Sequence, residues 1–143
     1  MRFIYPYTVR RSADGAWQIR FPDVPEAMTE GDTEAEARGL ADDTLLAALG
    51  GYGALKQDLP VASRRRAGQF VVVVPMLQSA KLALYQAMRE AKLNNVTLAR
   101  KLGKHEGEVR RMLDLDHDTK IAALESALLM LGKQVAIEVR QAA

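Results

Sequence analysis

The chain contains no cysteine and only two histidines among its 143 residues. The absence of cysteine excludes disulfides, thiolate metal sites and thiol nucleophiles together. No apolar run approaches the roughly 18 residues that a membrane span requires, so no transmembrane helix is expected. The amino terminus becomes charged again before the apolar core of a signal peptide could form, and we therefore expect a cytoplasmic protein.

The charge is unevenly distributed, although the formal net charge is only +2. Apolar residues make up 48% and charged residues 27%, which is typical of one soluble domain or of two small ones. Residues 12–58 contain three basic and ten acidic residues, a net charge of −7. Residues 81–111 contain eight basic and three acidic residues, a net charge of +5. This split indicates two modules with different partners.

The first module begins with two runs in which apolar and polar residues alternate. Residues 3–9 and 17–21 show the period of two that is typical of strands, and an Asp-Gly turn signal separates them. They predict a hairpin. Pro6 lacks a backbone donor, which places the first strand at an edge of the sheet or bulges it there. Residues 27–30 predict a short third strand.

A helix is predicted to follow the hairpin. Thr33 and Glu36 have the spacing of a capping box, and helical apolar spacing follows until Gly50-Gly51 ends it. Residues 52–68 indicate a connector. The β-branched run at residues 70–74 predicts a strand that is covered on both faces. The first module is thus ββ(β)αβ and spans residues 1–75.

The second module, residues 76–143, is predicted to be all-α, which makes the chain α+β. Apolar residues at helical spacing indicate a helix around residues 82–88, and short helices at 96–102 and 106–113 follow. A fourth helix begins near Ile121 and ends at Gly132. The tail at residues 134–139 alternates like a strand that has no local partner.

Residues 93–113, L-N-N-V-T-L-A-R-K-L-G-K-H-E-G-E-V-R-R-M-L, resemble the helix-turn-helix of the Xre and phage-repressor type. In that motif Asn94 caps the positioning helix, small Ala99 lets the second helix cross closely, and Gly103 makes the tight turn. The resemblance implies that the second short helix enters the major groove of DNA. The alternative is a small helical bundle with a basic, solvated face.

Nine residues of this motif are candidate DNA contacts. By position, Arg110 would pair with a guanine edge and Glu106 would accept a hydrogen bond from cytosine. Arg111 would serve either use or be solvated, and His105 has no second metal ligand near it. The full candidate set is Asn95, Arg100, Lys101, Lys104, His105, Glu106, Gly107, Arg110 and Arg111, of which Asn95, Arg100 and Lys101 would contact phosphates.

Residues 17–37, W-Q-I-R-F-P-D-V-P-E-A-M-T-E-G-D-T-E-A-E-A, resemble the signature of HicB-type antitoxins. That signature is a strand, Phe-Pro-Asp-Leu/Val-Pro, a short strand, Gly-Asp-Thr and a helix rich in Glu and Ala. The chain departs from it at Glu26-Ala27, where Gly-Cys is common in the family. With the helix-turn-helix, the resemblance covers nearly the full chain.

The resemblance implies a degenerate ribonuclease-H-like fold without nuclease activity and a partner toxin, HicA, which is a small basic ribonuclease. The toxin binds polyanionic RNA, so the acidic segment of this chain is a suitable surface to bind the toxin. The candidate toxin contacts are Asp23, Glu26, Glu30, Asp32, Asp42 and Asp43. No metal or cofactor is expected.

Other functions remain possible at this point. A stand-alone transcriptional regulator would use the first module only for assembly or for sensing another partner. A metal-dependent nuclease would need clustered carboxylates, which Asp14, Asp23, Asp32, Asp42 and Asp43 would have to supply. Each of these has a structural role in a turn, a cap or a helix. For operator DNA we expect a homodimer or a higher homo-oligomer, built either on the tail strand or, if the tail folds back, on another surface.

Overall fold

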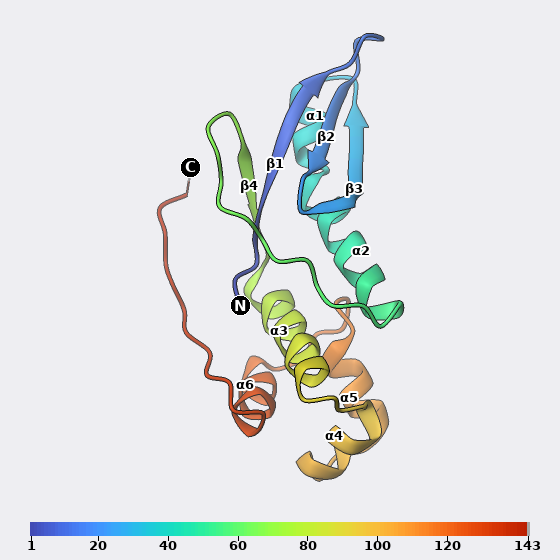
Figure 1. The fold of residues 1–143 in the computed structure, drawn as a ribbon, viewed down its shortest axis with the longest axis vertical. Coiled ribbons are helices and arrows are strands. Elements are labelled where there is room, and N and C mark those ends of the chain that lie inside the picture. The colour runs from blue at the N-terminus through green and yellow to red at the C-terminus, as the bar shows by residue number, and fades with distance from the viewer. Residues whose placement is uncertain (143) are drawn as a thin grey trace. The chain divides into compact units, whose positions relative to one another are not determined.

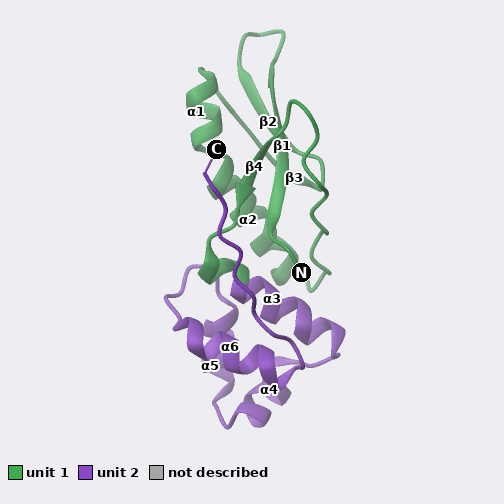
Figure 2. Ribbon diagram, turned by 90° about the vertical axis from the view of Figure 1, so that its left-hand side faces the viewer, with its two compact units in different colours: residues 1–79 green, residues 80–143 purple. Residues whose placement is uncertain are grey.

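The computed structural model describes residues 1–142, which divide into two compact units after Ser79 (Figure 2). Unit 1 contains the antiparallel sheet and its helices, whereas unit 2 is helical, so the α+β prediction is confirmed. Among the described residues, no helix combines the length and the apolar character that a membrane crossing demands.

Unit 1 is built on a four-stranded antiparallel sheet in the order β3-β2-β1-β4 (Figure 1). The strands are β1 (Ile4–Arg11), β2 (Trp17–Phe21), β3 (Val24–Gly31) and β4 (Phe70–Val73). The predicted hairpin of β1 and β2 is confirmed, and its turn is closed at Gly15, whose φ of 94° suits glycine. The third strand exists but is longer than residues 27–30.

The edge position predicted for the first strand from Pro6 is wrong, because β1 lies inside the sheet between β2 and β4. The register explains how proline is tolerated there. The β1–β2 ladder reaches only as far as Thr8, while β4 pairs with residues 4–7. Pro6 therefore lies in a stretch of β1 that has a strand neighbour on one side only, so its missing N–H removes no hydrogen bond to a second strand.

The prediction that residues 70–74 are covered on both faces is also wrong. β4 is an edge strand, in which Val72 is buried while Val71 and Val73 are exposed. The reason is that helices cover one face of the sheet only (Figure 1). A continuous β-branched run predicts a strand, but it does not show how many of its faces are buried.

Two helices follow β3, α1 (Glu34–Gly39) and α2 (Ala41–Ala54). The predicted capping box is confirmed, since the N–H of Glu36 donates to Thr33 Oγ1 at 3.2 Å and the N–H of Thr33 donates to Glu36 Oε2 at 3.2 Å. The predicted end at Gly50-Gly51 is wrong. Packing against the sheet carries α2 through both glycines, and it ends at Leu55, before Lys56 at φ 55°.

The core of unit 1 lies between the sheet and these two helices. Ile19 and Phe21 from β2 and Leu45 and Leu49 from α2 are each at most 2% exposed. The connector between α2 and β4 is attached to this core, because the hydroxyl of Tyr5 donates to the Pro60 carbonyl at 2.8 Å. Burial, together with nearby Asp23 and Tyr52, raises the pKa of Tyr5 to about 12.

The described part of unit 2 is made of the helices α3 (Met76–Glu90), α4 (Asn95–Leu102), α5 (Glu106–Leu113) and α6 (Ile121–Met130). The boundary between the units falls in the first turn of α3. The predicted short helices agree with α4 and α5. Gly132 follows α6 at φ 75°. The tail at residues 134–142 forms no strand within the described chain, and Val135, Ile137 and Val139 are exposed.

Candidate functional site

The helix pair α4–α5 is the best-defined candidate site of unit 2. Asn94 caps α4, because its Oδ1 accepts the N–H of Thr97 at 2.8 Å. Gly103 ends α4 in the left-handed conformation at φ 64°, where a side chain would be strained, and α5 begins three residues later. These local signals fix both ends of α4, and the glycine turn leads directly into α5.

The two helices are held together by a small apolar cluster. Leu98 and Val109 are completely buried, and Ala99 and Met112 are almost so. The methyl side chain of Ala99 allows close approach between helices that contact each other along their inner faces. The outer faces of α4 and α5 are left to solvent.

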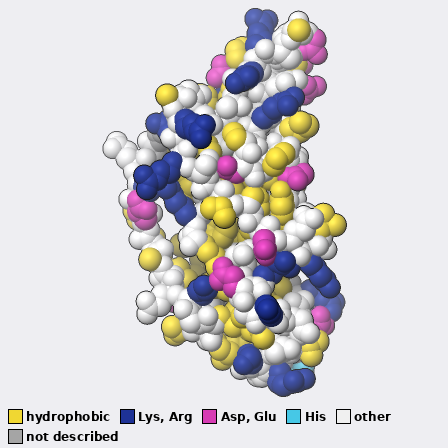
Figure 3. Space-filling view, in the orientation of Figure 1, with side chains coloured by type: hydrophobic (Ala, Val, Ile, Leu, Met, Phe, Trp, Pro, Cys, Tyr) yellow, Lys and Arg dark blue, Asp and Glu magenta, His cyan; other side chains and the backbone are white. Residues whose placement is uncertain are grey.

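Most of the candidate DNA contacts lie on these outer faces. Arg100, Lys101, Lys104, His105, Arg110 and Arg111 are exposed, while Asn95, Glu106 and Gly107 are half-buried. Figure 3 shows Lys and Arg side chains, with a histidine beside them, over the region that Figure 1 labels α4 and α5. The structure therefore brings the nine candidates together on one helix pair.

Glu106 joins the starts of the two helices. Its carboxylate accepts from the guanidinium of Arg110 at 2.5 Å and also from the side chain of Asn95. The hydrogen bond from Arg110, more than any other cause, lowers the pKa of Glu106. In the free chain Glu106 thus orients Arg110. A contact of Arg110 with a DNA base would have to form beside its ion pair with Glu106 or replace it.

Glu108 has a local structural role at the start of α5. Its carboxylate accepts the backbone N–H of His105 at 3.3 Å and lies 3.5 Å from the ammonium of Lys104. The backbone N–H of His105 is the main cause that lowers the pKa of Glu108. Glu108 therefore stabilises the helix start.

Sequence reasoning missed Lys81, which is the one charged side chain that is fully buried among the residues described, at 0% exposed. It lies on α3, and its ammonium donates to backbone carbonyls at the end of α5. The available signal was its spacing, since Lys81, Leu84 and Met88 occupy the buried side of one helix.

The candidate toxin contacts of unit 1 do not form a single cluster. Asp23 accepts from the backbone and the hydroxyl of Ser63, both at 2.9 Å, and so holds the connector. Glu26 accepts from the hydroxyl of Tyr52 at 2.8 Å, a bond that raises the pKa of Tyr52. These two carboxylates lie near the start of β3 and each has a structural partner.

The other four candidates lie beyond the middle of β3 or on the helices. Glu30 and Asp32 flank the end of β3, about 20 Å along the strand from its start. Asp42 and Asp43 are exposed in the first turn of α2, where carboxylates suit the helix dipole. No side-chain hydrogen bond or ion pair within residues 1–142 engages these four carboxylates. They are available to a partner.

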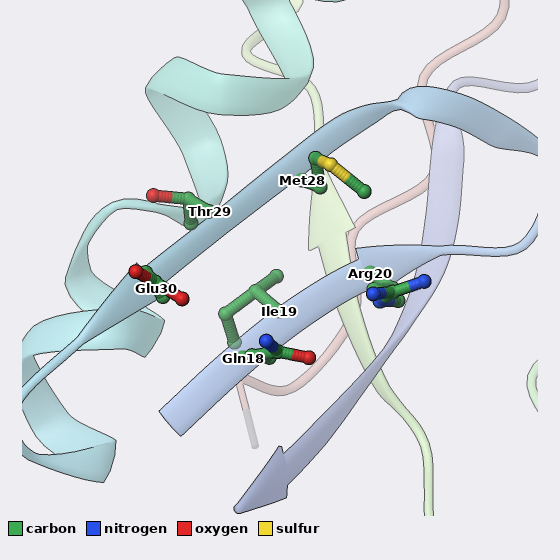
Figure 4. Close-up of a pocket in the computed structure, with 6 residues that line it drawn as sticks. All are labelled: Gln18, Ile19, Arg20, Met28, Thr29 and Glu30. Carbon is green, nitrogen blue, oxygen red and sulfur yellow. The ribbon is translucent and has the colours of Figure 1, made fainter. Parts of the chain in front are cut away.

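Glu30 also borders a shallow hollow of β2 and β3 (Figure 4). The hollow is lined by Gln18, Ile19, Arg20, Met28, Thr29 and Glu30. Gln18 pairs with Glu30 and Arg20 pairs with Met28 across the two strands, so these four side chains share one face. No histidine or cysteine lies among the lining residues.

The carboxylates that a nuclease site would require are dispersed. Among the described residues there is no group of three or more His, Cys, Asp or Glu side chains that could hold a metal ion. Asp14 stabilises the β1–β2 turn by accepting from the Ser12 hydroxyl and the Ala16 N–H. The hydrogen bond from Ser12, followed by that from Ala16, lowers the pKa of Asp14.

Comparison with known proteins gives a family match for most of unit 1 and relatives for the whole chain. Residues 4–83 match the family described as "HicB_like antitoxin of bacterial toxin-antitoxin system". "Antitoxin HicB 2" of Photorhabdus laumondii is 37% identical over 92% of each chain. "Antitoxin HicB" of Escherichia coli K12 is 34% identical over 93% of this chain and 96% of the relative. "Antitoxin HicB" of Pseudomonas fluorescens is 30% identical over 98% and 96%.

Proposed function

Since this chain belongs to the HicB-like family of bacterial antitoxins, we propose that it binds and neutralises a small basic ribonuclease toxin of the HicA type and represses its own operon by binding operator DNA. The observation that carries this proposal is the family match over residues 4–83, extended by relatives that align with both units. We assign toxin binding to residues 1–75 and DNA binding to residues 76–143.

For the toxin we propose the acidic surface of unit 1. Within it, Asp42 and Asp43 are the primary contacts, because both are exposed in the first turn of α2. Glu30 and Asp32 extend the surface, whereas Asp23 and Glu26 act mainly by holding the connector and α2. Carboxylates that mimic RNA phosphates would cover the basic face of the toxin. Unit 1 would then be a reduced ribonuclease-H-like domain that binds without cleaving.

For DNA we propose that α4 and α5 form an Xre-like helix-turn-helix with α5 as the recognition helix. Two short helices, a left-handed glycine turn and a basic outer face support this assignment. Arg100 and Lys101 would bind phosphates, and Arg110 with Glu106 would read base edges. One recognition helix contacts few bases, so the DNA-binding form would be a homodimer or a larger homo-oligomer.

The test is a separation of the two activities in the full chain. Asp42→Lys with Asp43→Lys should weaken co-purification with a small basic toxin encoded by a neighbouring gene and abolish rescue of the growth of cells that express this toxin, while operator binding persists. Arg110→Ala should weaken operator binding, while co-purification with the toxin and rescue of growth persist. The control, Asp116→Lys with Glu125→Lys, makes the same charge change on exposed residues of unit 2 and should leave toxin binding intact.

A stand-alone regulator predicts a different result. In that case the wild-type chain binds DNA, but it neither co-purifies with the neighbouring gene product nor rescues growth. Magnesium-dependent cleavage of RNA by the purified chain would favour the nuclease instead. Loss of both activities in both variants would contradict the division of labour between the units.

A further inference from the structure

Lys81 is a buried charged residue of α3 and does not lie on the exposed face of α4 and α5. Its side chain is 0% exposed, and it reaches from α3 to the segment that connects α5 with α6. A lysine at a fully buried position is unusual unless its ammonium is completely hydrogen-bonded. The burial of Lys81 therefore requires acceptors for its ammonium inside the protein.

The ammonium of Lys81 has three N–H donors, and each donates to an acceptor within the protein. It donates to the carbonyl of Arg111 at 2.9 Å, to the carbonyl of Asp114 at 2.7 Å and to Thr119 Oγ1 at 2.7 Å. The Thr119 hydroxyl donates in turn to the Arg111 carbonyl at 3.3 Å. Lys81 thus connects α3, the end of α5 and the turn before α6.

Electrostatics favour a cation at this place. The last carbonyls of a helix lack intrahelical partners and carry partial negative charge, which an ammonium compensates. Burial lowers the pKa of Lys81, and Asp114 and Asp118 oppose that shift. Removal of the ammonium would leave the Arg111 and Asp114 carbonyls with longer hydrogen bonds only, from the Asp114 N–H at 3.3 Å, the Thr119 hydroxyl at 3.3 Å and the His117 N–H at 3.2 Å, and would break their link to α3.

The anchor lies at the carboxyl end of α5. Val109 and Met112 pack the inner face of α5 against α4, whereas Lys81 binds the last backbone carbonyls of α5 and connects them to α3. We propose that Lys81 is the positioning residue of the DNA-binding helix: it fixes the carboxyl end of α5 and so sets the angle at which Arg110 and Arg111 meet the groove. This inference rests on the proposed DNA binding, and Lys81 itself touches no DNA.

A positioning role for Lys81 predicts a different effect on DNA binding from a direct contact with a DNA phosphate. All three donors of Lys81 are used inside the protein, so its loss removes no contact with DNA phosphates. Specific binding should fall because it depends on the geometry of α5, whereas non-specific binding and its salt dependence should not change. A residue that only stabilises the fold would leave specificity unchanged at temperatures where the variant is folded.

The experiment uses the full chain and an operator that the wild type selects from random duplex DNA. Lys81→Met should lower operator affinity at least tenfold at 10 °C, with random-sequence affinity and the salt slope unchanged. Lys120→Met, which removes the charge of an exposed lysine near the same turn, should bind as the wild type does. Circular dichroism confirms that each variant is folded. A folded Lys81→Met chain that discriminates operator from random DNA as well as the wild type overturns the inference.

A second variant keeps the inference testable if Lys81→Met does not fold. Thr119→Val removes one acceptor and leaves both carbonyl contacts, so a partial loss of specificity, about threefold, is expected. Hydrogen exchange at the amide of Asp114, which caps the carboxyl end of α5, should accelerate about tenfold in either variant. Unchanged exchange there overturns the anchor, whereas a wild-type chain that selects no DNA sequence refutes the proposed DNA binding and leaves the exchange result to decide the anchor.

Discussion

Replacement of Leu98 by alanine should destabilise unit 2 alone. Leu98 is 0% exposed at the contact of α4 with α5, and its truncation leaves a cavity in that contact. Fully buried Leu→Ala changes cost about 2–5 kcal/mol. A unit of about 60 residues has about 3–9 kcal/mol of stability, so this one change removes a large share of it. Its melting temperature should fall by about 10 °C or more.

The chain offers separate probes for its units. Trp17, the single tryptophan, lies on β2 in unit 1, so its fluorescence follows the unfolding of that unit. Circular dichroism at 222 nm follows the helices, most of which belong to unit 2. In Leu98→Ala the dichroism transition should move to lower urea or temperature, and the fluorescence transition should stay in place.

The matched control is Leu129→Ala, the same substitution at a side chain that is 60% exposed on α6. We expect a change within about 0.5 kcal/mol. A Leu98→Ala chain whose two transitions shift together by equal amounts would refute the independence of the units. A shift as small as that of the control would show that Leu98 does not hold the helix pair.

Three further predictions concern binding, pH and assembly. Arg110→Ala should weaken operator binding about tenfold and relax base preference, whereas Lys101→Ala should reduce the salt slope by about 1, as measured by fluorescence anisotropy in a salt series. The pKa of Tyr5 lies near 12 in the folded chain and near 10 in model compounds, so its contribution to stability is complete below pH 10 and is lost as the pH rises towards 12. Urea midpoints from Trp17 fluorescence should therefore fall over that range, and less so in Tyr5→Phe. Deletion of residues 133–143 should lower the oligomeric state by light scattering and abolish operator binding while toxin binding remains.

Local signals were sufficient for much of the fold. The hairpin, the capping box at Thr33 and the limits of α4 and α5 were predictable, because each depends on residues within one turn or one strand. The candidate DNA contacts could be placed on one helix pair for the same reason. Asn94 and Gly103 fix the helix ends, and helical spacing then determines which side chains face outwards.

Long-range packing decided the features that the sequence did not reveal. The contacts of α2 with the sheet outweigh the poor helix propensity of Gly50 and Gly51. The one-sided burial of β4 depends on where α1 and α2 lie, which the β-branched run does not encode. The acidic candidates were grouped by sequence, but β3 separates Asp23 from Asp32 because an extended strand moves them apart.

The pairing of charges on α4 and α5 bears on why two copies would be needed. Residues 93–113 contain five basic side chains, of which Lys104 and Arg110 are paired with glutamates. The other three cations of residues 93–113 make no ion pair within the described chain, and three phosphate contacts give a salt slope of only about −2.7. Such a monomer would have weak non-specific affinity and little specific affinity. Two copies would double the slope to about −5.4 and add a second recognition helix, so the strength of operator binding would come from assembly and from the fit of α5 rather than from charge.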